Sequence, residues 1–122
     1  MADKLLSGRR VLVIEDETLI LMMIEVMLSE LGCESITAAA TIDKALALIE
    51  AQAFDAAMLD MNLNGARSHS VAEALVAHGV PFVYCTGNNR HKLMDVPDHP
   101  PVLKKPFKYE QLVEVFTRLL SP

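Results

Sequence analysis

Hydrophobic and polar residues follow each other along this chain in a regular rhythm of short apolar runs and longer amphipathic stretches. The apolar runs span residues 9–14, 35–38, 56–59, 81–85 and 102–103. All five predict strands. The run at 9–14 predicts a strand that is buried on both faces and the run at 56–59 another buried strand, whereas 35–38 predicts a weak strand near an edge of the sheet. After the first run, apolar residues recur at helical spacing, as Ile20, Ile24 and Met27 do, and Gly32 stands where a helix C-cap belongs.

The amphipathic stretches predict helices between the strands and after the last of them, over residues 17–31, 41–51, 70–78 and 109–120. Thr41 is a suitable N-cap for the second of these helices. Ser70 and Glu73 have the S-x-x-E spacing of a capping box, so the third helix is predicted to begin at Ser70.

Two polar segments interrupt this rhythm. Residues 62–68 contain the dipeptide Asn64–Gly65, which predicts a loop. The segment from 88 to 101 is polar and contains three prolines. The helix expected between the last two strands, the fourth of the fold, is therefore predicted to be short or irregular and confined to about 90–95.

Five strands separated by helices predict an α/β fold in which helices cover both faces of a parallel sheet. Because crossovers between parallel strands are right-handed, we expect a doubly wound five-stranded sheet with strand order 2-1-3-4-5, the flavodoxin-like arrangement. Ligands of such sheets bind at the carboxyl ends of the strands, beside the point where the strand order reverses. The residues that follow each strand are therefore the candidates for function.

Polar side chains end four of the five predicted strands. Glu15 and Asp16 follow the first strand, Asp60 the third, Thr86 the fourth and Lys105 the fifth. Taken singly, each suits an ordinary role as a helix cap, a turn residue or an exposed side chain. Because these four strands are neighbours in the predicted order, we expect the five residues to meet on one edge of the sheet.

The chemistry of such a cluster is specific. Two carboxylates ~4 Å apart repel each other by about 4 kcal/mol at an effective dielectric near 20. Three carboxylates therefore favour a bound cation, and their oxygens suit Mg²⁺ or Mn²⁺. A lysine and a threonine hydroxyl can hold phosphate oxygens. The cluster thus predicts phosphoryl chemistry, with the central Asp60 as a nucleophile that forms an aspartyl phosphate.

Composition narrows the class of protein. The 122 residues suit one domain, and the net charge of −5 argues against binding nucleic acid through a basic patch. No apolar run approaches the ~20 residues that span a bilayer, and the N-terminus has no signal-peptide pattern, so we expect a cytoplasmic protein without membrane contact.

Cys33 and Cys85 are predicted to be free, partly buried thiols. The four histidines lack metal-ligand spacing and are predicted to be surface or loop residues.

Four stretches of the sequence, in order and at strand ends, carry a family resemblance. They are VLVIEDE (11–17), MLDMNLNG (58–65), YCTG (84–87) and KPF (105–107). With them the chain resembles the receiver domain of two-component response regulators over essentially its whole length. The resemblance implies a single receiver domain over residues 1–122 with no output domain. It implies a phosphoacceptor that promotes its own phosphorylation and dephosphorylation and is not otherwise an enzyme.

The resemblance also implies roles for the acidic residues and their neighbour. Asp60 is the expected phosphoacceptor, which takes its phosphoryl group from a histidine of a partner kinase or phosphotransfer protein. Asp16 is the expected direct Mg²⁺ ligand, and Glu15 a second acid that acts directly or through water. Asn62 is expected to offer its backbone carbonyl to the same metal ion.

Further roles concern the last two strands. Thr86 is expected to bind the phosphoryl group and couple it to backbone movement, and Lys105 to pair with Asp60 or its phosphate. The Lys105–Pro106 bond is expected to be cis, as in relatives. Many receivers carry an aromatic residue three positions before this lysine that rotates inward on activation, and here Val102 stands in its place.

The missing aromatic residue and the Pro-interrupted segment are both traits of a subclass of single-domain receivers named FATGUY after its fourth-strand motif. The corresponding stretch here is YCTGNN (84–89), which keeps Thr86 and Gly87 but differs on both sides of them. Membership of that subclass implies a histidine kinase of the HWE or a related type.

Two uses remain open within this class, a switch that binds an unknown downstream protein and a relay or phosphate sink that drains a kinase. The rival from another class is a phosphatase with an aspartyl nucleophile. Such enzymes carry D-x-D after their first strand, whereas here Asp60-x-Asn62 follows the third and lacks the general acid. An electron carrier of the same fold needs a phosphate loop after the first strand, where EDETL (15–19) repels phosphate.

Overall fold

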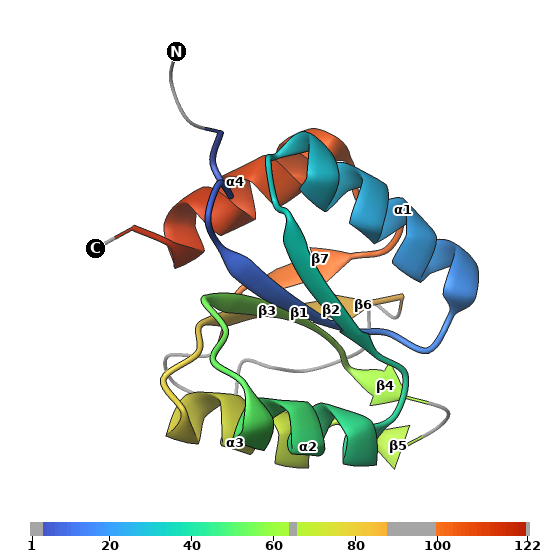
Figure 1. Cartoon of the computed structure of the whole chain (residues 1–122). Coiled ribbons are helices and arrows are strands. Elements are labelled where there is room, and N and C mark those ends of the chain that lie inside the picture. Colours follow the sequence, from blue (N-terminus) through green and yellow to red (C-terminus); the bar gives the residue numbers. More distant parts are fainter. Residues whose placement is uncertain (1–3, 64–65, 88–99, 122) are drawn as a thin grey trace.

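A five-stranded parallel sheet forms the centre of the molecule in the computed structural model, which describes residues 4–63, 66–87 and 100–121 (Figure 1). Its strands are β1 (Arg10–Ile14), β2 (Ser35–Ala39), β3 (Ala56–Asp60), β6 (Phe82–Thr86) and β7 (Val102–Lys104). Their order across the sheet is β2-β1-β3-β6-β7, and every neighbouring pair is parallel. The predicted order 2-1-3-4-5 is confirmed.

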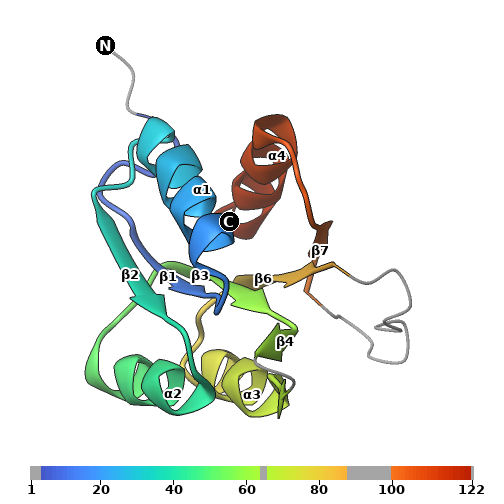
Figure 2. The same cartoon turned by 90° about the vertical axis from the view of Figure 1, so that its right-hand side faces the viewer.

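Helices cover both faces of this sheet. They are α1 (Thr18–Glu30), α2 (Ile42–Ala51), α3 (His69–Ala77) and α4 (Tyr109–Leu119). The helices α1 and α4 lie on one face, and α2 and α3 lie on the other (Figures 1 and 2). The fold is therefore doubly wound, as the alternation of strands and helices predicts. Among the described residues, no helix is both long enough and apolar enough to cross a bilayer.

The core consists of two apolar layers, one on each face of the sheet. Val11 and Val13 of β1 pack in the layer beneath α1 and α4, around Phe116. Leu12 and Ile14 belong to the opposite layer, which α2 and α3 cover. Because successive strand residues point to opposite faces and both faces are covered, the strand must be apolar throughout. This is the physical reason for the unbroken apolar runs in the sequence.

Two of the predicted helix ends are found where the sequence places them. The Thr41 hydroxyl oxygen accepts a hydrogen bond from the Lys44 backbone N–H at 3.1 Å and so caps α2. Gly32 follows α1 with a φ of +92°, and a Cβ at this position would lie 2.7 Å from the Cβ of Lys4. The turn therefore requires glycine for both its backbone conformation and its space.

The predicted capping box of α3 is wrong. The helix begins at His69, so Ser70 lies inside its first turn. The preceding residue, Ser68, makes no capping hydrogen bond with its side chain, but its carbonyl oxygen accepts from the Ala72 N–H at 3.1 Å. Its own N–H donates to the Met61 carbonyl at 3.3 Å, and with these two backbone bonds the helix is capped two residues earlier than the S-x-x-E spacing suggests.

The predicted loop at 62–68 contains a small hairpin. The strands β4 (Asn62–Leu63) and β5 (Ala66–Arg67) are antiparallel, and Leu63 pairs with Ala66. An Asn-Gly dipeptide between two short strands is a strong hairpin signal, and the buried Leu63 anchors this one to the core. The short helix predicted near 90–95 lies outside the described residues.

Both cysteines are free, as predicted, and both are buried rather than partly buried. Cys85 lies near the end of β6, and burial raises its pKa from an ordinary value of 9.0 to about 12. Burial also raises the pKa of Cys33. His69 and His78 are exposed, and the other two histidines lie outside the described residues.

We expect the folded protein to be almost inert toward thiol reagents at pH 8. The raised pKa of Cys85 cuts its thiolate fraction about 1000-fold, since each pKa unit is a factor of ten. Dithionitrobenzoate should therefore count no fast-reacting thiol in buffer and two per chain in denaturant. A Cys33→Ser variant isolates Cys85, and reaction of that thiol at the rate of a free cysteine in the native state would contradict its assigned burial.

Candidate functional site

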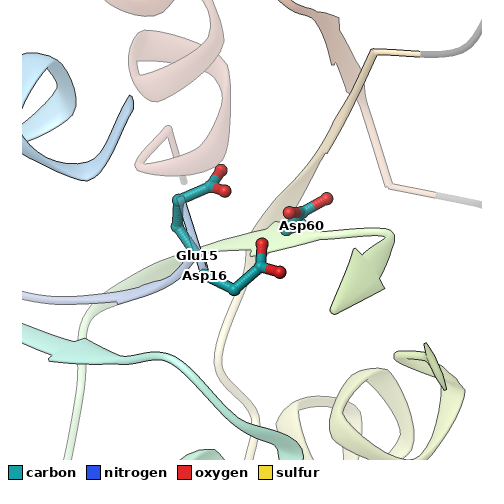
Figure 3. Close-up of side chains that lie close together, drawn as sticks. All are labelled: Glu15, Asp16 and Asp60. Carbon is teal, nitrogen blue, oxygen red and sulfur yellow. The ribbon is translucent and has the colours of Figure 1, made fainter. Parts of the chain in front are cut away.

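The five candidate residues meet at one edge of the sheet because four neighbouring strands end there. Glu15 and Asp16 follow β1, Asp60 is the last residue of β3, Thr86 is the last residue of β6, and Lys105 follows β7. Figure 3 shows the three acidic side chains gathered above these strand ends. Their proximity was expected from strand order alone, and the structure confirms the juxtaposition.

Three carboxylates form the acidic part of the site. Glu15, Asp16 and Asp60 each offer one oxygen, and these oxygens all lie within 4.8 Å of one another. In Figure 3 the Glu15 carboxylate lies above that of Asp16, with that of Asp60 beside both. Glu15 and Asp60 are buried, and Asp16 is partly exposed. An all-oxygen set of this size suits a small divalent cation, which would complete its shell with waters.

Lys105 binds two of these carboxylates at once. Its Nζ lies 2.7 Å from Glu15 Oε1 and 3.2 Å from Asp60 Oδ2, and its side chain is only 11% exposed. Burial by itself lowers the pKa of Lys105, but the hydrogen bond with Glu15 and the charge of Asp60 outweigh burial and leave that pKa raised. The side chain is therefore an ammonium ion at neutral pH. Its single positive charge is smaller than the combined negative charge of the three carboxylates.

The backbone around Lys105 fixes the direction of its side chain. Its N–H donates to the Thr86 carbonyl at 2.7 Å, which extends the pairing of β7 with β6 by one residue. The bond to Pro106 is cis, and the next residue, Phe107, is buried in the core. Lys104, one position earlier, is exposed. The two adjacent lysines thus have separate environments, and Lys105 alone of the pair reaches the acids.

The remaining candidates lie around this centre. Thr86 is buried at the end of β6, next to the strand that delivers Lys105. The backbone of Asn62 belongs to β4, directly after Met61, whose N–H donates to the Cys85 carbonyl at 3.0 Å. Val102 is half-exposed on β7 and lies beside Tyr84 in the strand register. A valine has no ring, so the aromatic rotation found in many receivers has no side chain here to perform it.

Sequence reasoning missed the partner that lies nearest to Lys105. The sequence indicates that a lysine and three acids share an edge, but it pairs Lys105 with Asp60 alone. In the structure the contact with Glu15 is shorter, and Glu15 is the more deeply buried acid. The signal that could have revealed it is the side-chain length of glutamate, which carries a carboxylate one methylene further from β1 than an aspartate would.

Comparison with known proteins decides the family. Residues 11–117 match the family model described as the response regulator receiver domain. The chain belongs to this family. A search of the curated proteins found no match for this receiver domain.

Solved structures of other receiver domains have the same fold. SdrG from Sphingomonas melonis Fr1 is 38% identical with a TM-score of 0.81, and the match covers 99% of this chain and 100% of that one. The receiver domain of the sensor histidine kinase PA1611 from Pseudomonas aeruginosa PAO1, solved with a magnesium ion in its active-site cleft, is 27% identical with a TM-score of 0.81, covering 93% and 98%. The receiver domain of PhyR from Erythrobacter litoralis is 27% identical with a TM-score of 0.82, covering 95% of each chain.

Replacement of Lys105 by methionine should destabilise the metal-free receiver domain. Removal of one partner from a buried ion pair costs about 3 kcal/mol, because the remaining carboxylates lose their compensating charge. Lys104→Met is the matched control, and its exposed position predicts a change within about 0.5 kcal/mol. Urea denaturation measures both variants, and equal losses of free energy of unfolding would contradict the bridging role of Lys105.

Proposed function

We propose that this receiver domain accepts a phosphoryl group on Asp60 and transmits the change to a protein partner. The donor is the phosphorylated histidine of a histidine kinase, of the HWE or a related type, or of a phosphotransfer protein. The observation that carries the proposal is the position of Asp60, whose carboxylate lies in reach of both a buried ammonium group and two further acids. Of the two uses of such a domain, the binding switch is the one we propose.

In the transfer step the protein mainly positions the reacting groups and stabilises their charge, and Asp60 alone forms a new covalent bond. A carboxylate oxygen of Asp60 forms a bond to phosphorus while the bond between phosphorus and the donor's histidine nitrogen breaks, and its electron pair returns to the imidazole ring. Lys105 is already 3.2 Å from Asp60, so its ammonium group can hold an oxygen of the incoming phosphoryl group. The Thr86 hydroxyl, at the end of the adjacent strand, would hold another.

The acids fit a divalent cation, Mg²⁺ or Mn²⁺. Asp16, Asp60 and the backbone carbonyl of Asn62 would hold it, with Glu15 as a second acid that acts directly or through water. The spacing of the three carboxylates and their excess of charge over Lys105 support this assignment. When bound, the ion would neutralise charge on the phosphoryl oxygens during transfer.

The acceptor assignment is tested by direct phosphorylation. Acetyl phosphate or a phosphorylated kinase, with Mg²⁺, should add one phosphoryl group per chain, detected by intact mass or radiolabel. Asp60→Asn should reduce the label at least about 100-fold, because an amide is not a nucleophile of this kind. Asp55→Asn is the matched control, since Asp55 lies at the opposite end of β3 and contacts Arg10. Equal labelling of Asp60→Asn and the wild-type protein would exclude Asp60 as the acceptor.

The metal assignment predicts stabilisation by magnesium without any phosphate. At about 100 times its dissociation constant, Mg²⁺ should add about 2.7 kcal/mol to the free energy of unfolding, because it binds the folded state alone. Asp16→Asn should abolish most of this gain, while Asp43→Asn, at an exposed position in the first turn of α2, should leave it unchanged. A full magnesium response in Asp16→Asn would remove Asp16 from the ligand set.

A further inference from the structure

The two edge strands of the sheet, β2 and β7, differ in how they are protected. An edge strand presents unpaired N–H and C=O groups that can pair with another chain, and proteins usually guard it with charges, prolines or bulges. The strand β7 is guarded in this way. It has only three residues, one of them the exposed Lys104, and Pro100 and Pro101 precede it. Its outer side is therefore a poor template for a further strand.

The strand β2 has no such guard. Its residues 35–39 read SITAA, without a charge or a proline, and its register with β1 runs through all five residues without a bulge. Four of the five residues are partly exposed. In Figure 1 β2 crosses the front of the molecule, and no other described segment lies in front of it or pairs with its outer side. An accessible, unbroken edge is therefore present on this side of the sheet.

The hydrogen bonds of β2 show which of its backbone groups face outward. The Glu15 N–H donates to the Ala39 carbonyl at 3.0 Å, so Ala39 turns its backbone groups toward β1. Because this direction alternates from one strand residue to the next, Ile36 and Ala38 turn theirs away from the sheet. These two residues lie on either side of Thr37, the centre of the strand. The outward groups are therefore arranged symmetrically, and the edge is complementary to itself.

We propose that β2 pairs antiparallel with β2 of a second copy of this chain, about a two-fold axis at Thr37. Ile36 of each copy then lies opposite Ala38 of the other, and these two pairs exchange about four hydrogen bonds. Each pair joins a large side chain to a small one, and Thr37 meets Thr37 of the second copy, a favourable cross-strand pair. The two five-stranded sheets then form one continuous sheet.

The charges around β2 favour this occupant and this direction. The exposed Glu34 directly precedes the strand. Antiparallel pairing places Glu34 opposite Ala40 of the second copy, close to the start of α2, and keeps the two Glu34 side chains at opposite ends of the pair. The N-terminus of a helix carries a partial positive charge, and the first turn of α2 contains Asp43 and Lys44, whose charges offset each other. The paired strands themselves bring no like charges together.

The pairing leaves the proposed phosphorylation site open. The candidate site residues stand at the ends of β1, β3, β6 and β7, and none belongs to β2. Antiparallel pairing also points the carboxyl edges of the two sheets in opposite directions. Dimerisation therefore does not depend on phosphorylation, and Asp60→Asn should dimerise as the wild-type protein does. Either proposal can fail without the other, because the dimer is measured without any phosphoryl donor.

A five-residue edge predicts a weak dimer, because its interface is small beside the roughly 1,200 Å² of stable complexes. With a dissociation constant of about 100 µM, sedimentation equilibrium should show mainly monomers at about 10 µM and mainly dimers at about 1 mM. Amide hydrogen exchange of Ile36 and Ala38 should slow over the same range, whereas Thr37, whose N–H faces β1, should not respond. A monomer at about 1 mM, or exchange at Ile36 and Ala38 that is independent of concentration, would overturn the proposal.

Charges at the centre of the strand test the pairing and its register. Thr37→Lys and Thr37→Glu each place like charges opposite each other and should weaken dimerisation at least about 10-fold. An equimolar mixture of the two variants should recover the wild-type affinity as a heterodimer, which also shows that both are folded. Val102→Lys, on the other edge strand, is the matched control and should dimerise normally. Unimpaired dimerisation of Thr37→Lys alone, or a mixture that stays monomeric, would contradict pairing through β2.

Discussion

The ammonium group of Lys105 is the charge on which the functional edge of this sheet depends. Two buried carboxylates, Glu15 and Asp60, lie within 3.2 Å of it and would otherwise face each other without compensation. Like charges at ~4 Å repel by about 4 kcal/mol at an effective dielectric near 20, which is a large part of the stability of a small domain. The single lysine that follows β7 therefore makes it possible to fold a chain in which acids stand at the ends of β1 and β3.

The strand order places that cation where it is needed. In the order β2-β1-β3-β6-β7, the strand that carries Lys105 lies two places from the strand that carries Asp60, and β6 stands between them. The N–H of Lys105 extends the ladder to Thr86, so the lysine starts from the end of β6 and its long side chain spans the remaining distance. A shorter cationic side chain at this position would not reach Glu15 and Asp60. Topology and side-chain length are thus joint requirements of the site.

The sequence predicts most of this architecture because the constraints involved are strong. A strand buried on both faces must be apolar, so the central strands β1, β3 and β6 stand out in the sequence. Right-handed crossovers then bring Asp60 and Lys105 to one edge. Features that depend on weaker sequence signals were not predicted correctly. Two nearby serines, Ser68 and Ser70, can each precede a helix, and backbone bonds of Ser68 decide between them. The two-residue strands β4 and β5 are too short to show a period. The preference of Lys105 for Glu15 depends on rotamers, which a sequence does not encode locally.

The absence of an aromatic residue at Val102 changes how a change at Asp60, the proposed phosphoacceptor, can reach the rest of the molecule. A valine that is 39% exposed has no ring to exchange between an inner and an outer position. A direct link exists nonetheless in the backbone, because the Lys105 N–H donates to the Thr86 carbonyl at 2.7 Å. If Asp60 carries a phosphoryl group, as we propose, movement of Thr86 or Lys105 toward that group would pull on the other residue through this hydrogen bond. Coupling between these two strands therefore requires no side-chain rotation.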